Sequence, residues 1–281
     1  MKTGIAMWHY PHRTTIENIE YFAGQGIKTL GLNQSQLTDA CEAGEGDELA
    51  QVIKKYDLTV TLHGALTYSH SEEDVTDYKK RMDTVGEWQK KYGLLSVVSF
   101  DVFECTRDNI TEYVRYALDN IPDCSIAVED FGLTADERAQ IEIFKNNERF
   151  GYLTDIGHMY MRLCGKSTRN DLTLFLNSPD ECPACDNPGK EQFLKAFKSK
   201  EFPIKEIHLH NNDGKNDMHY FLNDGTLDIK MIAQVLDETG YDGVVTIESA
   251  PGFMFECKYP ESDIRILEDV KYWEDICGGR I

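Results

Sequence analysis

The sequence predicts a single (β/α)8 barrel, and three observations predict it. Short β-rich runs alternate with amphipathic helical runs along the whole chain, the pattern of successive βα units on a parallel sheet. Eight such runs favour closure into a barrel over an open sheet. The length of 281 residues suits one barrel, which typically has about 250 residues. We therefore expect one domain that spans residues 1–281.

The predicted strands are short runs rich in β-branched and apolar residues. They cover residues 4–9, 27–33, 58–64, 94–101, 125–131, 150–156, 204–211 and 243–249. Helices fill the gaps, and three begin with a capping residue three positions before a glutamate: Thr14 to Glu17, Asn109 to Glu112, and Thr134 to Glu137. Residues 71–92 and 261–277 predict long solvated helices, and the second of these would complete the ring.

Residues 164–203 separate the sixth and seventh strands by more than one helix requires. We interpret them as an extended loop over the mouth of the barrel, followed by a helix near 190–200. Cys182 and Cys185 form the one CxxC motif of the chain. A structural zinc site, redox chemistry and ordinary thiols all remain open for this pair, although no second CxxC exists to complete a zinc knuckle. The eight scattered cysteines favour free thiols over a disulfide framework.

The composition excludes some classes of function. The formal net charge is −20, from 49 acidic and 29 basic residues, which disfavours a nucleic-acid partner because phosphates are neutralised by lysine and arginine. No apolar run approaches the roughly 18 to 20 residues of a membrane span. The N-terminus lacks the apolar core and cleavage site of a signal peptide. We expect a soluble cytoplasmic protein.

Polar side chains end five of the predicted strands. Side chains alternate between the barrel interior and the helix layer along each strand, and active sites of such barrels lie at the carboxyl ends of the strands. The inward positions at these ends are Thr61, His63, Glu129, Asp155, His208, His210 and Glu248. Two glutamates, an aspartate and a histidine that converge without a cation would raise one another's pKa values. A bound divalent metal resolves that conflict, and mixed carboxylate and imidazole ligands suit Mn, Co, Zn or Fe, with Mg weaker.

More polar residues follow two of these ends. His158 lies three residues past Asp155, at the start of the next turn or helix. Asp217 and His219 form a D-x-H pair seven residues past His210, and they would hold a second metal or a substrate oxygen. The alternative is a turn rich in glycine, asparagine and aspartate with incidental charges.

These residues carry a family likeness. The chain resembles the xylose-isomerase-like TIM-barrel superfamily, which groups sugar isomerases and epimerases, inosose-processing enzymes and endonuclease IV. The matching stretches are VEDFG (128–132), LTDIGHMY (153–160), HLHNNDGKNDMH (208–219), LNDGTLDI (222–229) and TIESA (246–250). They occur in order on the fifth to eighth strands, so the resemblance spans the barrel.

The resemblance implies a ligand set of Glu129, Asp155, His210 and Glu248 for a divalent metal (Mn, Co, Zn or Mg). His210 rather than His208 aligns with the family ligand, and His158 is implied to contact substrate or a second metal. Glu129 and Glu248 would also move the proton of a small sugar substrate as acid and base, while the metal stabilises the enediolate. The expected activity is sugar isomerisation or epimerisation.

Departures from the family pattern keep alternatives open. Asn211 stands where many relatives have aspartate, and Lys215 is the only base where the tagatose and psicose epimerases have arginine. An inosose-type dehydratase, or a non-catalytic sugar-binding barrel, would use the same scaffold. The endonuclease IV hypothesis predicts three zinc ions and cleavage of abasic DNA, with His63, His158, Asp217 and His219 among the additional ligands. Against it, the fourth strand ends in Asp101 where that enzyme has histidine.

Aromatic residues near the predicted mouth indicate a pocket wall. Trp8, His9 and Tyr10 end the first strand, and such rings stack on sugar faces or pack in a core. We expect Trp8 to contact substrate. Phe253, Met254 and Phe255 follow Glu248 and would line the mouth or, if exposed, form the contact of a homo-oligomer.

Overall fold

The computed structural model describes residues 1–7, 10, 12–65, 72–102, 110–130, 133, 135–165, 188–251 and 256–278. Eight parallel strands form one closed barrel in chain order, and β8 pairs with β1 to close it. This confirms the predicted fold class. The strands are β1 (Lys2–Ala6), β2 (Thr29–Asn33), β3 (Thr59–Ala65), β4 (Leu95–Asp101), β5 (Ser125–Glu129), β6 (Phe150–Asp155), β7 (Ile204–Leu209) and β8 (Val244–Ile247).

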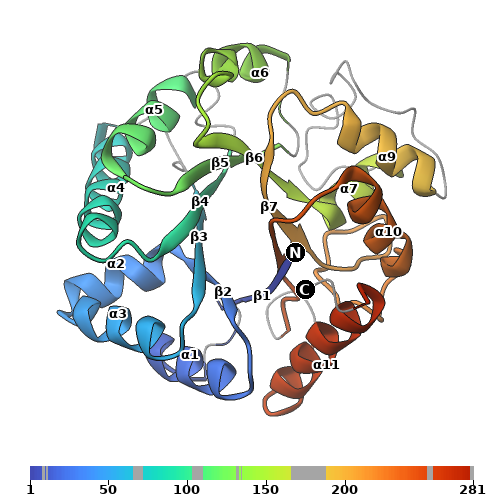
Figure 1. Ribbon diagram of the computed structural model, residues 1–281, viewed down its shortest axis with the longest axis horizontal. Helices are drawn as coiled ribbons and strands as arrows, with labels where there is room; N and C mark the ends of the chain where they lie inside the picture. Colours follow the sequence, from blue (N-terminus) through green and yellow to red (C-terminus); the bar gives the residue numbers. More distant parts are fainter. Residues whose placement is uncertain are drawn as a thin grey trace.

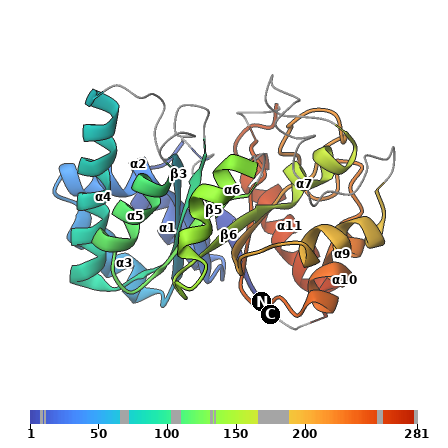
Figure 2. The same cartoon turned by 90° about the horizontal axis from the view of Figure 1, so that it is seen from above.

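Helices surround the barrel in chain order (Figure 1) and stand along its sides in the turned view (Figure 2). They are α1 (Thr15–Gly24), α2 (Gln34–Glu42), α3 (Gly46–Lys55), α4 (Glu72–Tyr92), α5 (Ile110–Asn120), α6 (Ala135–Ile141) with the 3-10 turn η2 (Glu142–Phe144), α7 (Ile156–Leu163), α9 (Lys190–Lys198), α10 (Ile229–Thr239) and α11 (Glu261–Ile276). None of the described helices combines the length and apolar character of a membrane span.

One of the three predicted capping signals lies wholly on described residues, and the structure confirms it. The capping box of α1 is present, because Glu17 N donates to Thr14 Oγ1 (3.2 Å) and Thr14 N donates to Glu17 Oε2 (2.8 Å). The other two capping residues lie outside the described residues. The first strand begins at Lys2, earlier than predicted, because Lys2 N donates to Gly243 O at the start of the β1–β8 pairing.

Alternation along the strands separates two cores. Val98, Val128 and Tyr152 point toward the helices and belong to the main apolar core. Val97, Ala127 and Leu153 form a separate apolar cluster on the other face of β4, β5 and β6. Each precedes by two residues a polar side chain that follows it on the same face of the strand: Ser99, Glu129 and Asp155. The interior is therefore apolar at the first of these positions and polar two residues further along each strand.

The segment between β6 and β7 is only partly described. Helix α7 begins immediately after β6, and α9 falls where the sequence predicts a helix near 190–200. The remaining part of the predicted extended loop, including Cys182 and Cys185, lies outside the described residues.

Candidate active site

The predicted metal ligands lie at the carboxyl ends of four consecutive strands. Glu129 and Asp155 are the last residues of β5 and β6, and His210 and Glu248 follow the last residues of β7 and β8. All four side chains are buried. Strand geometry therefore carries them to one end of the barrel, as alternation predicts.

Asp155 connects β6 to the next helix. Its Oδ1 accepts from His158 N (2.7 Å), so the carboxylate caps α7 at its N-terminus. This cap starts the helix at once and brings His158 back over the site, with Nδ1 2.7 Å from Glu129 Oε1. Gly157 lies between them, and His210 packs so closely on it that an added Cβ would lie 2.1 Å from His210 Cε1.

The four predicted ligands do not form one tight group; they fall into neighbouring groups of side chains that share Asp155. His210 Nε2 lies 3.2 Å from Asp155 Oδ1. Donor atoms of Glu129, Asp155 and His158 lie within 4.8 Å of one another, and so do those of Asp155, His208 and Glu248. Asp155 is common to both groups. His208, which the resemblance set aside, is thus placed beside two of the predicted ligands.

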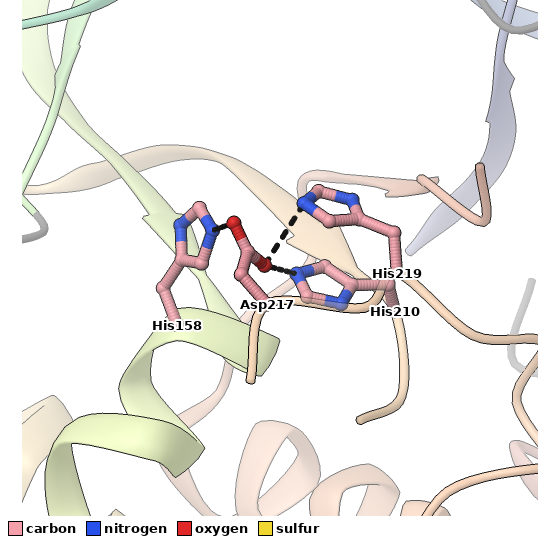
Figure 3. A group of neighbouring side chains, drawn as sticks. All are labelled: His158, His210, Asp217 and His219. Atoms are coloured by element: carbon pink, nitrogen blue, oxygen red, sulfur yellow. Dashed lines mark hydrogen bonds and ion pairs between the residues drawn. The ribbon is translucent and has the colours of Figure 1, made fainter. Parts of the chain in front are cut away.

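A second cluster adjoins this one (Figure 3). It comprises His158, His210, Asp217 and His219, whose donor atoms also lie within 4.8 Å of one another. Asp217 sits in the middle, with Oδ2 3.1 Å from His158 Nε2 and Oδ1 3.1 Å from His219 Nε2. The rings of His210 and His219 stack at 3.7 Å. The structure therefore brings both residues of the D-x-H pair against His158 and the predicted ligand His210.

The loop after β7 is shaped by two buried asparagines. Asn211 Nδ2 donates to Leu222 O (2.7 Å) and Leu227 O (3.1 Å), while Asn212 Nδ2 donates to Gly157 O (2.9 Å). A carboxylate at position 211 could not donate to those carbonyls. The departure at Asn211 is thus explained by its role in folding the loop that carries Asp217.

His63 lies at the other side of the site. Its Nδ1 is 3.1 Å from Ser99 Oγ, and its Nε2 is 3.4 Å from Asp101 Oδ1. Asp101 is also hydrogen-bonded to Glu129. His63 therefore contacts the site through Asp101, and its ring also packs edge-to-face on that of His208, with centroids 4.8 Å apart.

The one described member of the aromatic group expected at the mouth packs elsewhere. Tyr10 is buried in the main core against Phe22. Of the two roles expected for this ring, core packing rather than contact with a sugar therefore applies. Trp8, His9 and residues 253–255 lie outside the described residues.

The crowded charges raise the pKa of one carboxyl group at this site and lower the pKa of two others. Burial and the neighbouring Asp101 raise the pKa of Glu129 well above its ordinary value. Burial alone would raise the pKa of Glu248 as well, but His208 and His219 lower it to about 2. Burial likewise opposes ionisation of Asp155, yet His158 and His210 hold its pKa below the usual range.

The imidazoles show the reciprocal effect. Burial would lower the pKa of His219, but Glu248 and Asp217 raise it to about 9. The pKa of His158 is also raised well above its ordinary value, because Asp155, Asp217 and Glu129 outweigh its burial. Without a cation, protons on the histidines balance the carboxylates.

The donor set fits a divalent cation. His210 Nε2 and Asp155 Oδ2 are buried and make no hydrogen bond among the described residues. Buried polar atoms are nearly always paired, and both atom types are metal ligands. A bound ion would satisfy them and replace the balancing protons.

Two residues of the site were not predicted from the sequence, the half-buried Asp101 and the fully buried Glu206. Asp101 contacts both His63 and Glu129. Glu206 lies in β7 beneath His208, with His208 Nε2 3.6 Å from its Oε1. It stands two residues before His208 and four before His210, so the same alternation that selected the histidines would have placed it inside the barrel.

Solved structures of similar fold are named as sugar-processing proteins. A D-psicose 3-epimerase has a TM-score of 0.66 at 13% identity, with 99% of this chain and 100% of that chain covered. A D-tagatose 3-epimerase-like protein has 0.64 at 16%, with 99% and 98% covered. A 3-keto-D-glucoside 4-epimerase from E. coli has 0.63 at 15%, with 98% and 99% covered. At these identities the likeness shows the fold.

Sequence comparison identifies the family. An uncharacterized protein of Methanocaldococcus jannaschii is 23% identical over 136 residues, which cover 48% of this chain and 37% of the relative. The chain thus spans little more than a third of that relative's length. The profile described as xylose isomerase-like TIM barrel matches residues 19–268, and the chain therefore belongs to the xylose isomerase-like TIM barrel family.

Proposed function

We propose that this protein is a divalent-metal-dependent isomerase or epimerase of a small sugar or sugar derivative. One observation carries the proposal: Glu129 and Glu248 lie at the carboxyl ends of β5 and β8, and Asp155 and His210 lie at those of the two strands between them. The two glutamates thus flank a pair of buried ligand atoms that make no hydrogen bond among the described residues. The epimerases among the structures of similar fold support the reaction class.

The chain's own residues have distinct tasks in this proposal. Glu129, Asp155, His210 and Glu248 would hold the ion, which would be Mn, Co, Zn or Mg. When bound, the ion polarises the substrate carbonyl and stabilises the enediolate. Glu129 and Glu248 remove and return the proton of the adjacent carbon as base and acid. Asp155 keeps His158 over the site through its helix cap.

The test follows the proton. The purified protein is analysed for bound metal, and then a panel of free and phosphorylated sugars is incubated in deuterated water. We expect deuterium to enter one substrate carbon during turnover, and Glu129→Gln and Glu248→Gln each to lower exchange by about 100- to 10,000-fold. Glu42→Gln on the surface of α2 serves as the matched control. Exchange retained in both site variants would refute the assignment.

A second candidate is a multinuclear phosphodiesterase. The observation that favours it is the cluster of His158, Asp217 and His219 beside Glu129 and Asp155, since adjacent metal ions suit phosphodiester cleavage. This candidate predicts three bound ions and cleavage of abasic-site DNA. The isomerase predicts one or two ions and no cleavage at low salt. An inosose-type dehydratase, also open from the sequence, would be identified by a dehydrated product in the sugar panel.

A further inference from the structure

A charged residue lies inside the barrel where apolar side chains are usual. Interior positions of such barrels are mostly branched aliphatic residues, and Val97, Ala127 and Leu153 are apolar here. Glu206 in β7 is fully buried among them, and its main chain pairs with that of Leu153. An ionised carboxylate is expensive to bury unless it is hydrogen-bonded and matched by opposite charge.

Donors from other strands satisfy Glu206. Thr246 Oγ1 in β8 donates to Oε1 (2.8 Å), and Ser99 Oγ in β4 donates to Oε2 (3.2 Å). Because β4 and β8 lie on different sides of the ring, Glu206 is anchored across the barrel interior and its position is determined by the whole barrel.

His208 bridges Glu206 and the candidate acid–base residue. Its Nε2 is 3.6 Å from Glu206 Oε1, and its Nδ1 is 3.0 Å from Glu248 Oε2. The ring is buried and packs edge-to-face on His63, with centroids 4.8 Å apart. One nitrogen therefore faces the barrel interior and the other faces the mouth.

We propose that Glu206 and His208 are positioning residues that orient Glu248 from inside the barrel. His208 Nδ1 bonds one oxygen of Glu248 and leaves Oε1 for the cation and the substrate. Glu206, anchored by Ser99 and Thr246, sets the plane of the imidazole. Partners of this kind behind a ligand typically tune metal affinity by about 10- to 100-fold. The inference rests on the proposed function, because it gives Glu248 the ligand and proton-transfer roles.

Substitutions at position 208 separate the two ends of the bridge. The amide nitrogen of asparagine stands near the position of Nδ1, so His208→Asn keeps the donor to Glu248 and loses the contact with Glu206. The longer glutamine side chain of His208→Gln does the reverse. We expect His208→Gln and Glu206→Gln each to weaken Co²⁺ binding, measured by titration calorimetry and the Co²⁺ absorption spectrum, by about tenfold or more. His208→Asn should weaken Co²⁺ binding to the same extent as Glu206→Gln, because the two substitutions break the same contact.

The double variant isolates the connection. Once His208→Asn has removed the contact, adding Glu206→Gln should weaken Co²⁺ binding no further. In assays of the sugar reaction, Glu206→Gln should lower kcat and leave KM nearly unchanged, because Glu206 does not reach the mouth. Asp263→Asn removes another buried carboxylate, one paired with Arg13 (2.7 Å), and serves as the matched control with unchanged Co²⁺ affinity.

The outcomes distinguish this inference from the proposed function. Wild-type protein that binds no Co²⁺, Mn²⁺, Zn²⁺ or Mg²⁺ overturns both. Wild-type protein that binds Co²⁺ while Glu206→Gln and His208→Gln bind it equally well overturns the positioning role alone. Circular dichroism and a urea titration of each variant show that it is folded, and the near-isosteric Glu206→Gln keeps the test valid if a His208 variant does not fold.

Discussion

Single residues at this site are restricted by what packs on them. Gly157 separates the cap residue Asp155 from His158, and the His210 ring occupies the space where its side chain would be, with Nε2 2.4 Å from an ideal Cβ. The ring of His210 can therefore take its place at the site only because residue 157 has no side chain. Positions such as this one are invisible in the alternation pattern, because the restriction comes from a ring on a distant strand end.

Gly157→Ala should displace His210. We expect a loss of about 1–3 kcal/mol in the free energy of unfolding from overpacking, together with weaker binding of divalent metal. Gly24→Ala is the control, because Gly24 ends α1 and an added Cβ meets nothing within 4 Å. Urea unfolding and metal titration of both variants check this. Equal stability of the two variants would contradict the packing argument.

Asp269 is a buried carboxyl outside the candidate ligand set. It accepts from Leu222 N (3.0 Å) and from Ser249 Oγ (3.1 Å), and burial raises its pKa to about 7. The folded state thus holds a proton that the unfolded chain loses near its ordinary pKa of about 4. This contribution to stability is present at low pH and is lost as the pH rises from about 4 to about 7.

Asp269→Asn should remove that dependence. Relative to wild type, the variant should gain in free energy of unfolding as the pH rises from about 4 to about 8, by up to about 4 kcal/mol for a shift of about three pKa units. Urea titrations at several pH values measure the difference. A difference between variant and wild type that stays constant over this pH range would show that the carboxyl does not titrate in this way.

At the scale of elements, the ends of β5 and β6 are fastened together behind the site. Asp130 follows Glu129 and forms a buried ion pair with Lys200. Thr154 Oγ1, next to Asp155, donates to the same carboxylate (3.1 Å). Glu129 and Asp155 point into the barrel while their chain neighbours bond on the outside. The spacing of Glu129 and Asp155 thus depends on the ion pair between Asp130 and Lys200.

Lys200→Met should be strongly destabilising, by about 3–5 kcal/mol, since it leaves Asp130 buried without its counter-charge. The double variant Asp130→Asn with Lys200→Met should recover much of that loss. A double-mutant cycle from urea unfolding measures the coupling. Strictly additive single effects would mean that the pair contributes nothing specific.

For the whole molecule, metal binding and proton release should be linked. His219, with a pKa raised to about 9, is mostly protonated near neutral pH, and a cation held by its partner Glu248 would favour loss of that proton. Its pairing with Glu248 and Asp217 stabilises the metal-free fold fully below about pH 6.5, and that contribution is lost as the pH rises toward about 9.

We therefore expect divalent metal to bind with release of protons, and to bind more tightly at about pH 8.5 than at about pH 6.5. Calorimetry in buffers of different ionisation enthalpy counts the protons. Metal at about 100 times its Kd should add about 2.7 kcal/mol to the free energy of unfolding, and a chelator should reverse the gain. Affinity that is independent of pH over this range would contradict a link between metal binding and the proton on His219.

The sequence by itself determined the number and order of the strands and the residue types at their ends. These depend on alternation and capping, which are local properties of the chain, so they alone suffice to place Glu129, Asp155, His210 and Glu248 at one mouth of a barrel. The same alternation would also have placed Glu206 inside the barrel. It could not have predicted which residues Glu206 bonds, because a single buried glutamate carries no signal of its partners.

Only the tertiary structure decided which side chain meets which. The register shifts between β3 and β4 and between β6 and β7, and such offsets set how far each strand end rises into the mouth. Strand register and closure bring His208 to Glu248, Asp217 to His158 and Asp101 to Glu129, from parts of the chain far apart in sequence. Because these contacts arise from the closed ring, no local pattern along the chain encodes them.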